Sequence, residues 1–250
     1  MGLVGVNKAP GRSAEQGERT TLLCVPFAGA GGSFFHPWRA LSAGRWRVVA
    51  FEPPGRERRM LDTPYRNVVE AAKNEVDDLA ATLGEGARVV VFGHSLGAVL
   101  AYEFVHLLST RDVHVQQLVV SGSPGPWTQR ERRATGLPDE EFFARVEEFA
   151  GFRHEALDHP EMRELILPVL RADCEMHENY VPSTDEPVRV PICSLRGASD
   201  GLVTAAEAQQ WRDATTDEFS YTELPGDHMY LTDSGREVLD VIDALQERHS

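Results

Sequence analysis

Short apolar runs and amphipathic segments alternate along most of this 250-residue chain. Apolar runs that end at Gly or Pro are typical of buried strands, and apolar residues at helical spacing indicate amphipathic helices. The sequence predicts strands at residues 21–25, 46–51, 88–92, 117–121, 188–195 and 219–224. It predicts helices at residues 34–42, 67–83, 98–108, 205–215 and 235–246, with Ser33 as the N-cap of the first.

The alternation stops between residues 125 and 183, where the pattern predicts no strand but two helices, at residues 140–149 and 161–180. Alternating strands and helices indicate an α/β fold with a mostly parallel sheet flanked by helices. In such folds ligands bind at the carboxyl edge of the strands, so we interpret the helical insertion as a lid over that edge.

Length and composition favour one domain over residues 20–250, because 42% hydrophobic residues suffice for a single large core. Residues 1–19 are rich in Gly, Ser and charge, and we expect them to form a flexible tail. No apolar run is long enough to span a membrane, and the first twenty residues do not resemble a secretory signal.

The net charge and the cysteine content argue against several classes of partner and site. The net charge of −14 argues against nucleic acid and anionic membranes as general partners. Cys24, Cys174 and Cys193 are odd in number and lack metal-type spacing, which is typical of reduced thiols in a cytoplasmic protein. We therefore predict no metal site and no disulfide.

The segment Gly93-His94-Ser95-Leu96-Gly97 carries the strongest chemical signal. It lies between a predicted strand and a predicted helix, as in a nucleophile elbow, where a strained turn exposes the serine hydroxyl. Flanking glycines let the strand and the helix pack closely. The alternative is a glycine-rich turn with an incidental serine, but the strand–turn–helix context favours Ser95 as a nucleophile.

A serine hydroxyl is a weak nucleophile and needs a base, which an acid must orient. In folds with this elbow, the acid and then the histidine follow the serine along the chain. Asp200 follows the strand predicted at residues 188–195, and His228 follows the strand predicted at residues 219–224. Both loops should open at the edge of the sheet that carries Ser95. The sequence therefore predicts a Ser95–Asp200–His228 triad.

Other histidines and acids fit the pattern less well. His36 follows the glycine-rich loop and could line the site, whereas His94 is predicted to support packing beside the nucleophile. His177 lies in the insertion, away from any strand end. Asp227 adjoins the predicted base, so the two side chains should point apart, and Asp173 falls in a predicted helix.

An oxyanion hole requires backbone N–H groups that point at the negative oxygen of the tetrahedral intermediate. One should come from Leu96, the residue after the nucleophile, and the other from the loop after the first strand. In that loop Ala28 is the first choice and Phe27 the second. The glycine-rich loop matches neither a P-loop nor a dinucleotide-binding pattern, which argues against a phosphate cradle.

Taken together, these residues resemble a type II thioesterase, the stand-alone editing hydrolase of polyketide and nonribosomal peptide assembly lines. The resemblance spans about residues 21–245. Its motifs are Pro26-Phe27-Ala28-Gly29, Gly31-Gly32-Ser33, Pro54-Gly55-Arg56-Glu57-Arg58-Arg59, the elbow with Ala98, Leu170-Arg171-Ala172-Asp173, Gly197 with Asp200, and Gly226-Asp227-His228. The arginine-rich and Leu-Arg-Ala-Asp motifs are the most particular to the family.

The resemblance implies an α/β-hydrolase fold, the same triad and a mobile helical lid at about residues 125–183. It also implies a substrate: an acyl thioester on the phosphopantetheine arm of a carrier protein, hydrolysed without a cofactor. A general carboxylester hydrolase or an acyltransferase with the same triad is the alternative, and a non-catalytic protein that kept the pocket fits least well.

Two arginine clusters stand out in this acidic chain. They comprise Arg56, Arg58 and Arg59, and Arg130, Arg132 and Arg133. Such clusters are commonly solvated surface. Because the family's carrier proteins are typically acidic, we expect one of the clusters to offset the repulsion between two acidic proteins and to contact the carrier.

Overall fold

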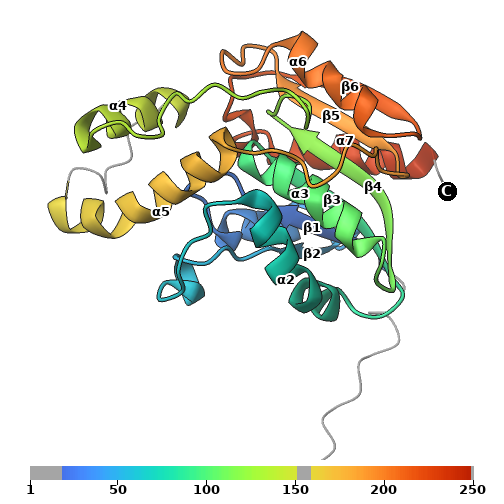
Figure 1. Cartoon of the computed structure of the whole chain (residues 1–250). Coiled ribbons are helices and arrows are strands. Elements are labelled where there is room, and N and C mark those ends of the chain that lie inside the picture. Colours follow the sequence, from blue (N-terminus) through green and yellow to red (C-terminus); the bar gives the residue numbers. More distant parts are fainter. Residues whose placement is uncertain (1–18, 151–158, 249–250) are drawn as a thin grey trace, which may run out of the picture.

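The computed structural model describes residues 19–150 and 159–248. Within these ranges, helices pack on both faces of a parallel sheet and a helical insertion projects from its side (Figure 1). The predicted tail lies outside the described residues, apart from Arg19. The strands are β1 (Thr21–Val25), β2 (Arg47–Ala50), β3 (Ala87–His94), β4 (Val113–Ser121), β5 (Ile192–Gly197) and β6 (Phe219–Leu224).

The helices follow the predicted order, and with the strands they confirm the predicted fold class. They are α1 (His36–Leu41), α2 (Val68–Leu83), α3 (Leu96–Leu108), α4 (Asp139–Ala150), α5 (Pro160–Glu178), α6 (Ala205–Gln209) and α7 (Gly235–Arg248). None of the helices in the described ranges has the length and apolar character that a bilayer crossing requires.

The strand order β2-β1-β3-β4-β5-β6 explains where a site can form. All neighbouring strands are parallel, so their carboxyl ends lie at one edge of the sheet. The chain passes outward from β1 to β2 and then returns to β3 on the other side of β1. This reversal is a topological switch point, and the loops after β1 and β3 diverge there to leave a crevice.

Alternating side chains of the strands build two hydrophobic cores. One core, against α2 and α3, includes Leu23, Val25, Val89, Val91, Leu118 and Val120. The other, against α1 and α7, includes Leu22, Cys24, Val90, Phe92 and Val119. Because successive residues of a strand point to opposite faces, a continuous apolar run is buried on both sides.

The insertion has a small core of its own, although α5 also reaches the main one. Phe142 and Phe143 of α4 pack with Leu170 and Cys174 of α5. One turn later, Met176 of α5 joins the core that contains α2 and α3. Helix α5 is therefore the part of the insertion that is anchored to the domain.

Three local predictions need correction. Ser33 does not cap a helix: it lies inside the 3₁₀ turn Gly32–Phe35, and its hydroxyl hydrogen-bonds Glu57 instead. Strand β5 begins at Ile192 rather than at residue 188, because Pro191 has no N–H to continue the ladder. The helix predicted at residues 205–215 changes after α6 into a 3₁₀ helix, Gln210–Ala214.

Backbone contacts at the turn between β3 and α3 leave no room for side chains. A methyl group at Gly93 would lie 2.1 Å from the carbonyl oxygen of Gly97. One at Gly97 would lie 2.2 Å from the carbonyl oxygen of Val25 in β1. Glycine at these two positions therefore lets α3 approach the centre of the sheet, as the elbow motif predicts.

We predict that Gly97→Ala lowers the free energy of unfolding by at least about 2 kcal/mol, since the added carbon must push α3 away from β1. Urea denaturation measures the change. Gly201→Ala is the control, because a methyl group there meets no heavy atom within 4 Å. Equal denaturation midpoints for the two variants would contradict the packing argument.

Candidate active site

Ser95 occupies a strained turn between β3 and α3. Its φ and ψ angles are 53° and −115°, a region that residues other than glycine rarely adopt. The backbone N–H of Ser95 donates to the carbonyl oxygen of Ser121 at the end of β4, 2.8 Å away. Strain of this kind persists only where the surroundings fix it, and it is common at functional positions.

Asp200 and His228 meet as the sequence predicts, from the loops after β5 and β6. His228 Nδ1 lies 2.8 Å from Asp200 Oδ2. The other carboxylate oxygen accepts the N–H groups of Leu202, at 2.8 Å, and Val203, at 3.0 Å. Asp200 thus holds the imidazole of His228 with Nδ1 toward the carboxylate. This leaves Nε2 as the nitrogen that can take a proton.

The charge of Asp200 results from opposing effects. Burial by itself raises the pKa of this carboxyl, but the hydrogen bond and charge of His228 and the two backbone N–H donors lower it. The net pKa is below the usual value of 3.8. Asp200 is therefore ionised at neutral pH and able to stabilise a positive charge on the adjacent imidazole.

Ser95 and His228 line the same cavity, which has a volume of about 710 Å³. The loop after β1, the loop after β4 and both helices of the insertion complete its wall. The serine hydroxyl and the imidazole do not form a hydrogen bond in this structure. Such bonds are often long in unliganded enzymes and shorten when substrate binds, so the arrangement is compatible with a nucleophile and its base.

Backbone N–H groups suited to an oxyanion are available next to Ser95 and in the loop after β1, which lines this cavity. Leu96 is the first residue of α3, where N–H groups have no partner within the helix and the helix dipole favours negative charge. Phe27 and Ala28 line the cavity, and no described residue accepts a hydrogen bond from either N–H. The N–H of Gly29 is instead occupied by Asp173. The sequence-based choice between Ala28 and Phe27 therefore stays open.

His94 lies directly behind the predicted base. It is fully buried, and its Nδ1 is 2.8 Å from the Ser121 hydroxyl, which in turn is 2.7 Å from the Tyr230 hydroxyl. The rings of His94 and His228 have centroids 5.0 Å apart. A methyl group at Gly122 would lie 2.6 Å from His94 Cε1 and 3.1 Å from His228 Cε1. The two imidazoles are thus packed closely around a glycine.

Sequence reasoning missed two residues that line the cavity, Arg130 and His177. Arg130 Nε donates to His177 Nε2 across 3.4 Å, and its guanidinium lies over the ring of Tyr180. Burial lowers the pKa of Arg130 to about 10 and that of His177 well below its usual value. Both lie in or beside the insertion, whose position over the strand ends no local sequence pattern specifies. His36, by contrast, is exposed at the start of α1 and does not line the cavity.

The first arginine cluster is divided between interior and surface. Arg56 forms an ion pair with Asp173 of α5 that leaves only 11% of its side chain exposed, so little of its surface can meet a partner protein. Arg59 is partly buried and pairs with Glu75 of α2. Arg58 projects into solvent, with 82% of its side chain exposed.

The second cluster is divided in the same way. Arg130 is turned toward the cavity, whereas Arg132 is exposed. Arg133 is also exposed and forms an ion pair with Glu131. Arg56 and Arg130 are thus engaged inside the fold and Arg133 also lines the cavity, and docking of a carrier on these clusters stays a prediction.

Comparison with known proteins gives the family. A family model described as Thioesterase domain matches residues 20–245. The chain belongs to the thioesterase family. It is 32% identical to the gramicidin S biosynthesis protein GrsT of Aneurinibacillus migulanus over 224 residues, which cover 88% of this chain and 86% of GrsT.

Solved structures agree with this assignment. The thioesterase RedJ from the prodiginine pathway of Streptomyces coelicolor matches with a TM-score of 0.82 and 29% identity, over 94% of this chain and 89% of RedJ. BorB, the type II thioesterase of the borrelidin biosynthetic cluster, matches with a TM-score of 0.77 and 31% identity over 90% of each chain. The predicted resemblance to type II thioesterases is confirmed, and the chain is a hydrolase that acts on thioesters.

We predict that His94 makes this thioesterase less stable in mild acid. Burial lowers the pKa of His94 well below its usual value of 6.5. Below pH 6.5 the unfolded chain therefore binds a proton that the folded chain does not, and stability falls by about 1.4 kcal/mol per pH unit. His94→Asn should reduce this slope, as measured by urea denaturation between about pH 7 and pH 5. His114→Asn, at an exposed position, is the control; equal slopes for the two variants would contradict the prediction.

Proposed function

We propose that this thioesterase releases acyl groups from the phosphopantetheine arm of carrier proteins by means of a Ser95–His228–Asp200 triad. The observation that carries the proposal is the 2.8 Å contact between His228 and the buried Asp200, at the edge of the cavity that holds Ser95. The relatives named above belong to gramicidin S, prodiginine and borrelidin biosynthesis, which supports a carrier-bound substrate.

The proposed reaction has two halves. Ser95 Oγ attacks the thioester carbonyl while His228 takes its proton, and the amides of Leu96 and of Ala28 or Phe27 bind the oxyanion. The carbon–sulfur bond then breaks, and the pantetheine sulfur takes a proton from His228 and leaves. In the second half, His228 removes a proton from water, which attacks the acyl-serine ester. The bond between the acyl carbon and Ser95 Oγ then breaks, His228 returns the proton to Oγ, and the free acid leaves.

The cavity wall supports an acyl substrate. Between α4 and α5 it is lined by apolar side chains, namely Val146, Phe149, Ile166 and Leu170. Apolar surface of this kind binds a hydrocarbon chain by removing its apolar surface from water. We also keep the prediction of a cytoplasmic location, which the three free cysteine thiols support.

We predict that Ser95→Ala reduces kcat for an acyl-loaded carrier by at least about 10⁴-fold, because the nucleophile is lost. Asp200→Asn should reduce kcat by about 10³- to 10⁴-fold, since the imidazole loses its orienting charge. Ser199→Ala, at an exposed position next to Asp200, should retain activity. Turnover by Ser95→Ala near that of the wild type, in a folded protein, would refute the triad.

Three further measurements separate this proposal from its alternatives. A short acyl thioester compared with the matching oxygen ester distinguishes a thioesterase from a general carboxylester hydrolase. Product analysis with an added amine or alcohol detects acyl transfer to acceptors other than water. Covalent labelling of Ser95 by a fluorophosphonate would exclude a non-catalytic protein that kept the pocket.

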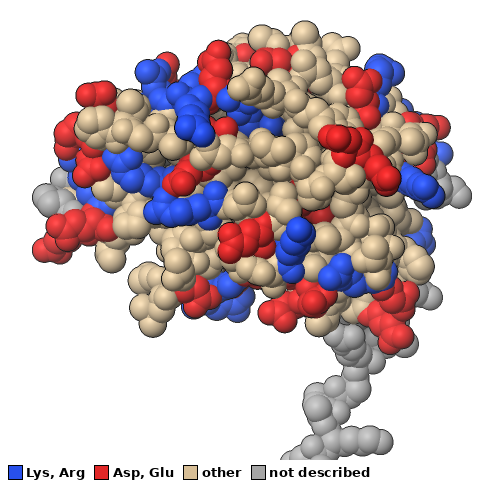
Figure 2. All heavy atoms as spheres, in the orientation of Figure 1, with Lys and Arg blue, Asp and Glu red and all other residues tan. Residues whose placement is uncertain are grey.

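The carrier is proposed to dock on the exposed members of the arginine clusters, which are Arg58, Arg132 and Arg133. Figure 2 shows that basic and acidic side chains are interspersed on this face of the molecule, including over the insertion. With a net charge of −14 the chain repels an acidic partner at long range, so local arginine contacts have to supply the attraction. Beside Arg58, Met60 and Leu61 are exposed by 61% and 98%, which adds an apolar surface to the charge.

We predict that Arg58→Glu raises KM for a carrier-bound substrate about fivefold, equivalent to about 1 kcal/mol, and leaves small soluble thioesters unaffected. Arg189→Glu is the matched control. Arg189 is exposed and precedes β5, so it lies at the opposite edge of the sheet from Ser95. An equal rise in KM for small thioesters would show that Arg58 has a structural role only.

A further inference from the structure

Asp173 of α5 makes a direct contact with the loop after β1. The backbone N–H of Gly29 donates to Asp173 Oδ2 across 2.7 Å. One helical turn earlier on α5, Leu170 packs over the same glycine, where an added methyl group would lie 2.7 Å from its Cδ2 atom. With φ at +80°, Gly29 adopts a conformation that other residues rarely take. The helical insertion thus rests on the loop from which the second oxyanion donor is expected.

Arg56 completes this contact from the loop after β2. Its Nη1 and Nη2 atoms lie 2.7 and 2.8 Å from the two carboxylate oxygens of Asp173, and Nη1 also donates to the carbonyl oxygen of Ala30 at 3.0 Å. Only 11% of the Arg56 side chain and 4% of the Asp173 side chain are exposed. The pair therefore joins three separate segments at a buried point, with the two-pronged geometry that makes Arg–carboxylate pairs strong.

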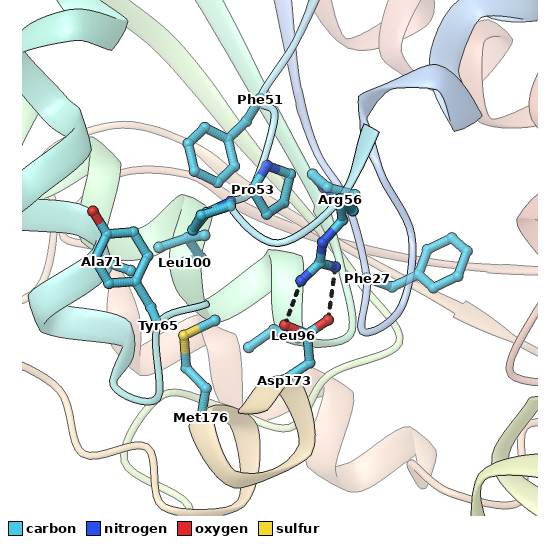
Figure 3. Close-up of a pocket in the computed structure, with 12 residues that line it drawn as sticks. Phe27, Phe51, Pro53, Arg56, Tyr65, Ala71, Leu96, Leu100, Asp173 and Met176 are labelled. Carbon is cyan, nitrogen blue, oxygen red and sulfur yellow. Dashed lines mark hydrogen bonds and ion pairs between the residues drawn. The ribbon is translucent and has the colours of Figure 1, made fainter. Parts of the chain in front are cut away.

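The pair borders the two segments from which the oxyanion donors are expected. Figure 3 shows Arg56 and Asp173 facing each other, with Phe27 and Leu96 close to them. These four residues line one small hollow of about 20 Å³, together with apolar side chains such as Leu100 and Met176. Both candidate sources of oxyanion donors, the loop after β1 and the start of α3, thus border the same buried pair.

The contact with Gly29 limits how its neighbour can move. Ala28 joins two peptide planes, and the plane shared with Gly29 is held by the hydrogen bond to Asp173. The Ala30 carbonyl, two residues on, is held by Arg56. The peptide plane that carries the Ala28 N–H also carries the Phe27 carbonyl, which accepts from the Ala30 N–H across 3.0 Å. Rotation of the Ala28 N–H away from the cavity would therefore break a hydrogen bond inside the loop segment that Asp173 and Arg56 hold.

We propose that Asp173 and Arg56 are positioning residues that couple the helical insertion to the oxyanion hole. When α5 packs against the loop after β1, the pair holds the loop's N–H group in position to bind the oxyanion. When α5 moves away, this N–H group is no longer aligned and the acyl-transfer step slows. This inference rests on the proposed function of Ser95. It gives α5 a part in the chemistry in addition to its part in the cavity wall.

The test removes both charges together, as Arg56→Met with Asp173→Leu, because removal of one partner alone would leave a buried charge unpaired. We expect kcat for a small acyl thioester to fall about 10- to 100-fold, less than the 10²- to 10³-fold typical when an oxyanion donor is lost outright. KM should change by less than about threefold, since the cavity wall that binds the acyl chain is kept.

Glu175→Gln is the matched control. Glu175 also lies on α5 and forms an ion pair with Arg66, but it does not contact the loop after β1. If the Asp173–Arg56 pair only attaches the insertion to the domain, as the Glu175–Arg66 pair does, the double variant and Glu175→Gln should have similar effects on kcat. If it positions the oxyanion loop, only the double variant should lose kcat. Arg56→Lys, which retains the positive charge and its pairing with Asp173, should lose less activity than the double variant.

Two readouts do not depend on the carrier or on turnover. The rate constant for labelling of Ser95 by a fluorophosphonate should fall in parallel with kcat, because the phosphonyl oxygen uses the same donors. Hydrogen exchange at the Gly29 amide should accelerate in the double variant and not in Glu175→Gln. Absence of labelling in the wild type would refute the proposed function itself, whereas the exchange result still reports on the coupling.

A folded double variant with wild-type kcat and labelling rate would overturn the inference. If the double variant does not fold, Asp173→Asn replaces it. Asp173 Oδ2 accepts from both Gly29 and Arg56 Nη1, and Oδ1 accepts from Arg56 Nη2; an asparagine loses the negative charge and has an NH₂ group, which cannot accept, in place of one of these oxygens. The same criteria then apply to Asp173→Asn. An unchanged kcat and an unchanged labelling rate would overturn the inference, and a loss of kcat without a change in KM would support it.

Discussion

The close contact between α3 and β1 is the constraint on which the site depends. Gly97 brings the start of α3 against the carbonyl oxygen of Val25, with no space for a methyl group between them. The loop after β1 and the turn that carries Ser95 are therefore held side by side. An oxyanion hole shared between two loops needs this proximity, because its donors must converge on one atom. The strained backbone of Ser95 is the local consequence of the same packing.

The ionisable groups buried near His228 differ in charge because each is buried with different partners. Asp200 keeps its charge, since its two oxygens accept hydrogen bonds from His228 and from two backbone N–H groups. His94 and His177 are buried without a carboxylate partner among the described residues, and burial lowers their pKa well below the usual value. At neutral pH both rings are uncharged. The positive charge that forms on His228 during the reaction therefore meets one anion and no competing cationic imidazole.

Local sequence patterns predicted the features of the structure that short segments of the chain determine. The spacing of apolar residues and the turn residues predicted the strands and the elbow. The parallel sheet predicted that the loops carrying Ser95, Asp200 and His228 open at one edge, and the structure brings Asp200 and His228 together as expected. What the patterns did not predict depends on contacts across long stretches of chain. Asp173 was set aside as a helical residue of the insertion, yet it contacts Gly29, 144 positions earlier. Arg56, similarly, was interpreted as a surface residue because its partner is 117 positions away.

The tight space around Gly122 has a consequence for engineering. Its Cα hydrogen points at the gap between the imidazoles of His94 and His228, with φ at +55°. Even a methyl group at this position would displace one of the rings, although alanine adds no ionisable group. Directed evolution toward new acyl preferences would therefore do best to diversify the apolar wall between α4 and α5 and to leave this position unchanged.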